Sequence, residues 1–142
     1  TPALSSAASD VYKRQVSEDF TELNKRKLLN FGHTVGHLIE KDSEFKVSHG
    51  EAVAIGMYYE LLLSKKHMGL PQEVINSYLK YLEKIEYNYT YKFSKGKDSI
   101  MEALKNDKKS LIDNVDIVLL SGISMPHIIN IKFDELFEVI DY

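Results

Sequence analysis

The chain of 142 residues has no cysteine and no tryptophan, and it contains only three prolines. Without thiolates it forms no disulfide, and any metal ion must be held by histidine and carboxylate groups. The formal net charge is only −3, which gives no sign of a nucleic-acid footprint. No apolar run approaches the roughly 18 residues of a membrane span, and no signal peptide is visible. These absences favour a cytoplasmic globular protein whose partners are neither nucleic acids nor membranes.

The first 15 residues look foreign to the protein. The run Asp10-Val11-Tyr12-Lys13-Arg14-Gln15 resembles the in-frame translation of a transposon-type sequencing adapter. We therefore predict that residues 1–15 are not native, the alternative being a disordered native tail rich in Ser and Ala. The chain has no initiating Met, so we expect a piece of a longer protein. Residues 16–142 suffice for one domain with its own core.

The most informative stretch is Arg26–Glu40, which the apolar spacing predicts to lie within a helix spanning residues 22–41. At about 100° per residue, one narrow polar stripe carries a guanidinium, an amide and two imidazoles, those of Arg26, Asn30, His33 and His37. Gly32 and Gly36 lie on another face and cost about 1 kcal/mol each relative to Ala. This cost predicts a closely packed neighbour. The pattern is typical of the wall of a binding site.

A second motif, Ser48–Met57, begins with Ser48 and Glu51 in the spacing of a capping box. This spacing places His49 in the first turn of a second helix. Its small residues, Gly50, Ala52, Ala54 and Gly56, match the glycine face of the first helix. Close packing of the two helices would bring three imidazoles together, which suits a transition-metal ion. From spacing alone, both His33 and His37 qualify as ligands.

The rest of the sequence predicts a mainly helical domain that ends with a small β-hairpin. The aromatic segment 87–93 is expected to be extended and to pack against the helices. Apolar periodicity and turn residues predict further helices at 49–68, 72–86, 98–106 and 133–141, and strands at 116–120 and 127–131.

The motifs Leu29–His37 and His49–Met57 resemble the C-terminal domain of the 3-dehydroquinate synthase family. The likeness continues through Asn106-Asp107-Lys108-Lys109 and covers about residues 16–142. Two long motifs in the right order are specific, whereas a lone HxxxH pattern would not be. The resemblance implies the mainly α fold of that domain. It also divides the histidines: His33 and His49 match the zinc ligands, and His37 matches a histidine that contacts substrate and helps to move protons.

The resemblance implies roles for three further polar residues. Arg26 and Asn30 match residues that contact the substrate, which agrees with the capacity of a guanidinium to bind phosphate and of an amide to bind hydroxyls. Lys108, rather than Lys109, is assigned to the substrate phosphate. The competing interpretation for the lysines is a solvated helix end, where cations are favoured anyway. His67 and His127 lie outside the motifs and are expected to be structural.

The family reaction converts 3-deoxy-D-arabino-heptulosonate 7-phosphate into 3-dehydroquinate with elimination of phosphate, on the shikimate route to aromatic amino acids. By resemblance, the expected cofactors are NAD and zinc, or another divalent metal such as cobalt. The expected partners are a small sugar phosphate and a second copy of the full-length protein, as a homodimer.

This sequence departs from the family in two respects. No strand–GxGxxG–helix pattern is present, and the family's third zinc ligand is a glutamate that would lie upstream. We therefore expect the chain alone to be inactive and to bind zinc weakly. Two alternatives stay open: a related sugar-phosphate cyclase or metal-dependent polyol dehydrogenase, and a non-catalytic helical module that has kept its histidines.

Overall fold

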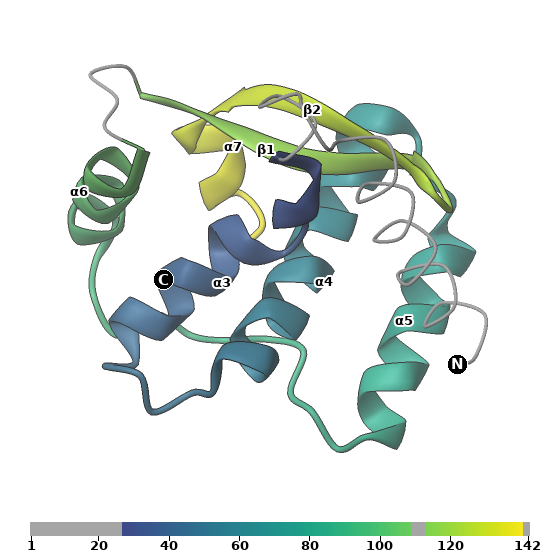
Figure 1. The fold of residues 1–142 in the computed structure, drawn as a ribbon, viewed down its shortest axis with the longest axis horizontal. Coiled ribbons are helices and arrows are strands. Elements are labelled where there is room, and N and C mark those ends of the chain that lie inside the picture. Colours follow the sequence, from purple (N-terminus) through teal and green to yellow (C-terminus); the bar gives the residue numbers. More distant parts are fainter. Residues whose placement is uncertain (1–26, 109–112, 141–142) are drawn as a thin grey trace.

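The computed structural model describes residues 27–108 and 113–140 (Figure 1). Most of this part of the chain is helical, and two antiparallel strands form its sheet, which confirms the predicted fold class. None of the described helices is long and apolar enough to cross a membrane. In chain order the elements are η1 (Lys27–Asn30), α3 (His33–Asp42), α4 (His49–Met68), α5 (Gln72–Lys84), α6 (Lys97–Lys108), β1 (Asn114–Gly122), β2 (Met125–Lys132) and α7 (Phe133–Phe137).

Helix α4 occupies the centre of the domain, with α3 on one side, α5 on the other and the hairpin across their ends (Figure 1). Its residues contribute to two separate apolar clusters. Ile55 and Leu63 belong to the cluster that also contains α3, α6, α7 and the inner face of the hairpin. Leu61 belongs to the second cluster, formed with α5 and Leu120. Burial on both sides therefore fixes α4 as the element against which the others pack.

A backbone-to-backbone contact of glycines joins α3 to α4. A Cβ atom at Gly56 would lie 2.1 Å from the carbonyl oxygen of Gly32, and one at Gly36 would lie 3.1 Å from Val53 Cα. The predicted close packing of the two helices is thus confirmed. Gly50 takes no part in it, because a Cβ there would meet nothing within 4 Å.

The hairpin is attached to α4 through a buried serine. The Ser64 hydroxyl donates to the Glu60 carbonyl at 2.6 Å and accepts from the Leu120 backbone N–H at 2.9 Å. One side chain therefore satisfies a strand N–H that the β1–β2 ladder leaves buried. A buried N–H without such a partner would cost about 1–3 kcal/mol.

The predicted continuous helix over residues 22–41 is wrong. Residues 22–26 lie outside the described residues, and 27–30 form a short 3-10 helix before a break at Phe31 and Gly32. Gly32 has φ = 81°, a left-handed conformation that suits glycine, and α3 begins only at His33. Asn30 is consequently not on the same helix as the histidines.

Other predicted elements agree more closely. Helix α4 begins at His49 after Ser48 and ends at Met68 before Gly69, whose φ is 70°. Helix α5 ends two residues earlier than expected, both strands are longer, and α7 is shorter. Segment 87–93 forms no strand beyond an isolated bridge. Its packing against the helices is only partial, since Phe93 is buried and Tyr89 contacts the Tyr58 ring, whereas Tyr87 and Tyr89 are exposed.

Asp42 at the end of α3 holds the segment that follows α5. Its carboxylate accepts hydrogen bonds from the Tyr91 hydroxyl at 2.7 Å and from the backbone N–H groups of Ser94 at 2.8 Å and Lys95 at 3.1 Å. Partial burial of the carboxyl group opposes ionisation, but these hydrogen bonds outweigh it and hold the pKa of Asp42 below its ordinary value of 3.8.

The glycine contact predicts a large difference between two Gly→Ala substitutions. Gly56→Ala should lower the free energy of unfolding by about 1–3 kcal/mol, since the new methyl group meets backbone that cannot move aside. The control, Gly50→Ala, should leave stability unchanged or raise it by up to about 1 kcal/mol. Urea unfolding of both variants measures the difference, and equal effects would contradict the contact.

The Asp42 hydrogen bonds predict a pH-dependent contribution to stability. Because the folded-state pKa lies below the unfolded value, the contribution is present above that value and is lost as the pH falls through the lowered pKa. Asp42→Asn should therefore cost about 1 kcal/mol at neutral pH, since the donors of Tyr91, Ser94 and Lys95 lose a charged acceptor. The difference from the wild type should vanish in acid. A difference that is constant over the whole pH range of an unfolding series would refute this.

Candidate metal centre

His33 stands at the start of α3, where a buried glutamate fixes the backbone. The Gly32 N–H donates to a Glu60 carboxylate oxygen at 2.6 Å, and Glu60 is fully buried on α4. The Nδ1 atom of His33 lies 3.2 Å from the Phe31 carbonyl oxygen. A carbonyl only accepts hydrogen bonds, so Nδ1 carries the proton and Nε2 keeps a lone pair for a ligand.

The three motif histidines converge. His37 lies one turn after His33 on α3, and His49 is the first residue of α4. The ring centres of His33 and His49 are 5.4 Å apart, those of His33 and His37 are 5.6 Å apart, and those of His37 and His49 are 6.3 Å apart. Two imidazoles that bind one tetrahedral zinc ion at about 2.0–2.1 Å place their ring centres roughly 5 Å apart. The predicted clustering of the three rings is confirmed.

The surroundings of His33 favour the neutral ring. Partial burial lowers its pKa from 6.5, and the neighbouring His37 and His49 lower it further. The hydrogen bond to Phe31 and the charge of Glu40 act in the opposite direction but are outweighed. A neutral imidazole is the form that binds metal, so His33 is available as a ligand at neutral pH.

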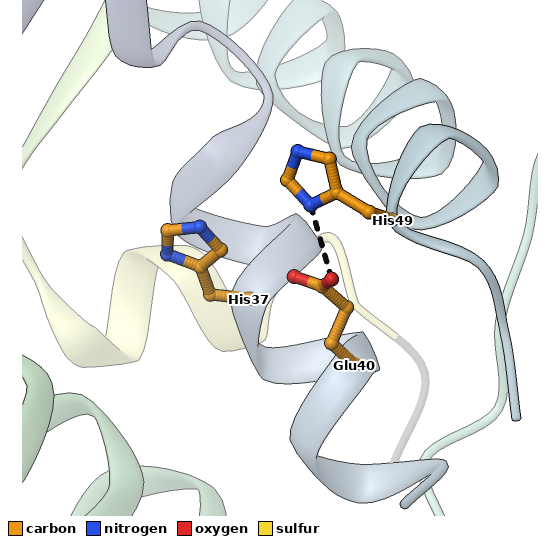
Figure 2. Close-up of side chains that lie close together, drawn as sticks. All are labelled: His37, Glu40 and His49. Atoms are coloured by element: carbon orange, nitrogen blue, oxygen red, sulfur yellow. Dashed lines mark hydrogen bonds and ion pairs between the residues drawn. The ribbon is translucent and has the colours of Figure 1, made fainter. Parts of the chain in front are cut away.

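Glu40 also belongs to this centre, although the sequence analysis did not select it. Its Oε1 lies 3.0 Å from His49 Nδ1 (Figure 2). When one ligand atom is taken from each of His37, Glu40 and His49, the three atoms lie within 4.8 Å of one another. The signal was present in the spacing, because Glu40 follows His33 by seven residues and His37 by three and so shares their stripe.

A cleft between α4 and α5 opens beside the histidines. It has a volume of about 420 Å³. On its far wall the Tyr78 hydroxyl donates to the Ala54 carbonyl at 2.6 Å, and burial raises the Tyr78 pKa. Apolar walls beside a few polar groups are typical of sites for small molecules. The cleft is lined by His33, His49, Gly50, Val53, Ala54, Met57, Tyr78, Tyr81, Leu82, Ile85 and Tyr87.

The other predicted site residues lie outside α3 and α4. Asn30 is exposed on η1, before the break at Gly32. Arg26 and Lys109 lie outside the described residues, and of Lys108 only the backbone is described, at the end of α6. His127, which was expected to be structural, pairs with Ser121 on the hairpin, with 2.8 Å between Nε2 and Oγ.

The donor set fits a divalent ion of the zinc or cobalt type. Imidazole nitrogens suit both metals, and a carboxylate stands beside them. The ring separation of His33 and His49 allows both rings to reach one ion.

Comparison with known proteins identifies the family. A family model described as 3-dehydroquinate synthase C-terminal matches residues 3–110. The chain belongs to this family. The match begins inside the segment that we predict to be adapter-derived, and that prediction concerns residues outside the described part of the chain.

Curated members of the 3-dehydroquinate synthase family are similar over most of the chain. The 3-dehydroquinate synthase of Clostridium tetani is 38% identical over 133 residues, which are 92% of this chain and 35% of that protein. The 3-dehydroquinate synthase of Listeria monocytogenes is 37% identical over 87% of this chain and 34% of that protein. The chain thus spans about a third of the length of the relatives that it matches.

A solved structure shares the fold. The crystal structure of 2-deoxy-scyllo-inosose synthase, complexed with carbaglucose-6-phosphate, NAD+ and Co2+, superimposes with a TM-score of 0.67 at 28% identity. The likeness covers 79% of this chain and 34% of the other.

The buried contact between Glu60 and Gly32 predicts that the start of α3 depends on α4. Glu60→Ala should lower the free energy of unfolding by about 1–3 kcal/mol, because the Gly32 N–H loses its buried acceptor. Glu60→Gln keeps an acceptor oxygen and should lose less. Thermal or urea unfolding measures the stability of both variants. Equal losses of stability in the two variants would show that the hydrogen bond to Gly32 does not stabilise the fold.

Proposed function

We propose that this chain is the metal- and substrate-binding part of a 3-dehydroquinate synthase. The reaction is conversion of 3-deoxy-D-arabino-heptulosonate 7-phosphate to 3-dehydroquinate with elimination of phosphate, in the shikimate pathway. The supporting observation is that two helices bring the His33 and His49 rings to 5.4 Å from each other, in a chain that is 38% identical to a relative of that name. Because the chain spans about a third of those relatives, the activity is assigned to the longer protein.

Each histidine has a proposed role. His33 and His49 hold the divalent ion, and the Nδ1 contact of His33 with the Phe31 carbonyl leaves its Nε2 for that purpose. His37 is next along the same face of α3, where it faces the substrate and moves a proton. When bound, the metal supplies Lewis-acid polarisation of a substrate oxygen, and NAD supplies reversible hydride transfer. No residue of this chain is assigned to NAD.

The substrate's other groups are assigned to polar residues of the family motifs. Arg26 and Lys108 bind the phosphate, and Asn30 binds a hydroxyl group. Fixed positive charge at a leaving phosphate stabilises the charge that develops as the bond breaks. The longer protein is further proposed to act as a homodimer in the cytoplasm.

A second candidate function is a related sugar-phosphate cyclase. The observation in its favour is the fold shared with 2-deoxy-scyllo-inosose synthase at a TM-score of 0.67. Sequence identity favours the first candidate, at 38% and 37% for 3-dehydroquinate synthases against 28% for that structure. A coupled assay of the full-length protein on the heptulosonate phosphate and on a hexose 6-phosphate separates them, and turnover of the hexose phosphate alone would favour the second.

Loss of either proposed ligand predicts loss of metal and activity together. In the full-length protein, His33→Ala and His49→Ala should each lower kcat/KM by at least about 100-fold, since metal catalysis supplies several kcal/mol. Bound metal measured by elemental analysis should fall in parallel. The control His127→Ala removes a histidine that pairs with Ser121 on the hairpin and should change neither quantity. Wild-type activity and metal content in both ligand variants would instead support a non-catalytic module.

A further inference from the structure

We propose that Glu40 is a positioning residue, which holds the His49 ring in the Nδ1–H form and so presents Nε2 to the divalent ion. The inference rests on the proposed function in one respect, the assignment of His49 as a ligand. It concerns a residue that neither the motif analysis nor the comparisons assign.

The geometry requires the proton to lie between the two side chains. His49 Nδ1 and Glu40 Oε1 are 3.0 Å apart, and an ionised carboxylate can only accept a hydrogen bond. Nδ1 must therefore carry the proton. Figure 2 shows the second ring nitrogen of His49 on the side of the ring away from Glu40. With Nδ1 protonated, that nitrogen holds the lone pair that a metal needs.

Burial explains why this contact can orient the ring. The His49 side chain is 59% exposed, so packing does little to restrain it, whereas the Glu40 side chain is only 12% exposed. Glu40 also lies within the last turn of α3, which the glycine contact holds against α4. The largely buried Glu40 carboxylate thus restrains the exposed His49 imidazole. Carboxylate partners of this kind raise the basicity of a metal-bound histidine and fix its orientation.

The same atoms also suit a second role for Glu40, that of a direct metal ligand. His37, Glu40 and His49 place three ligand atoms within 4.8 Å of one another, so the carboxylate could bind an ion directly. The hydrogen bond argues for positioning, because it engages both Nδ1 and Oε1 and leaves Nε2 of His49 for a centre shared with His33. The rings of those two histidines are also the closest pair of the three, at 5.4 Å. The two roles predict different effects on metal binding when Glu40 is replaced.

The first experiment measures the His49 tautomer in the metal-free, 15N-labelled chain by long-range 1H–15N correlation, at a pH above the histidine titration. The wild type should show the Nδ1–H form, and Glu40→Ala should convert His49 largely to the Nε2–H form. Glu51→Ala removes the same charge two residues after His49, in the first turn of α4, and should leave the tautomer unchanged. An Nε2–H form in the wild type, or no change in Glu40→Ala, would overturn the proposal.

The second experiment titrates the same chains with Co2+ and follows the broadening and shifts of the ring signals. Glu40→Ala should weaken binding by about 10–100-fold. Glu40→Gln keeps an acceptor oxygen and should lose less, which also separates positioning from misfolding. If Glu40→Ala and His37→Ala abolish binding as fully as His49→Ala, the carboxylate is a ligand and the proposal is wrong. Absence of Co2+ binding to the wild type would also count against it.

These readouts are independent of the proposed reaction. The tautomer is measured without metal, NAD or sugar phosphate, so its failure concerns Glu40 alone. An Nδ1–H tautomer sensitive to Glu40, together with a full-length protein that does not turn over the heptulosonate phosphate, would reject the reaction and keep the positioning role.

Discussion

The direct contact between the backbones of α3 and α4 is the constraint on which the candidate site depends. A Cβ atom at Gly56 would lie only 2.1 Å from the Gly32 carbonyl oxygen, which is too close for any side chain. Without side chains between them, the two helices come close enough for residues on both to share one centre. The ring separations of 5.4 and 6.3 Å between His49 and the two histidines of α3 follow from this approach. The Glu60 carboxylate then fixes where α3 begins.

Much of the fold could be predicted because local signals and tertiary packing agree. Ser48 and Gly69 mark the ends of α4, since an N-cap hydroxyl and a left-handed glycine terminate a helix by chemistry that a sequence displays. The convergence of the three imidazoles was also predictable from the matching small residues of two amphipathic segments. The lengths of the two strands and the end of α7 were less predictable, because the ends of helices and strands depend on long-range contacts.

Two features of the site could not be obtained from the pattern of residues. The apolar spacing runs unbroken through Gly32, yet the chain turns there at a φ of 81°, and Met57 and Val53 of α4 leave no room for a Cβ. That demand comes from tertiary structure, and it leaves Asn30 on η1 instead of on α3. Glu40 does lie on the predicted face, but its role depends on the connection to α4, which decides whether His49 Nδ1 comes within 3.0 Å. The aromatic wall of the cleft comes from α5, outside any motif.

The attachment of the hairpin through Ser64 bears on which substitutions can affect the metal centre. The hydroxyl joins the α4 backbone to a strand N–H and lies about four turns from His49 along the same helix. Sequence drift among the exposed side chains of β2 leaves this hydrogen bond and the apolar packing of β1 in place. Such separation lets one surface of the domain diversify while the chemistry beside α3 is preserved.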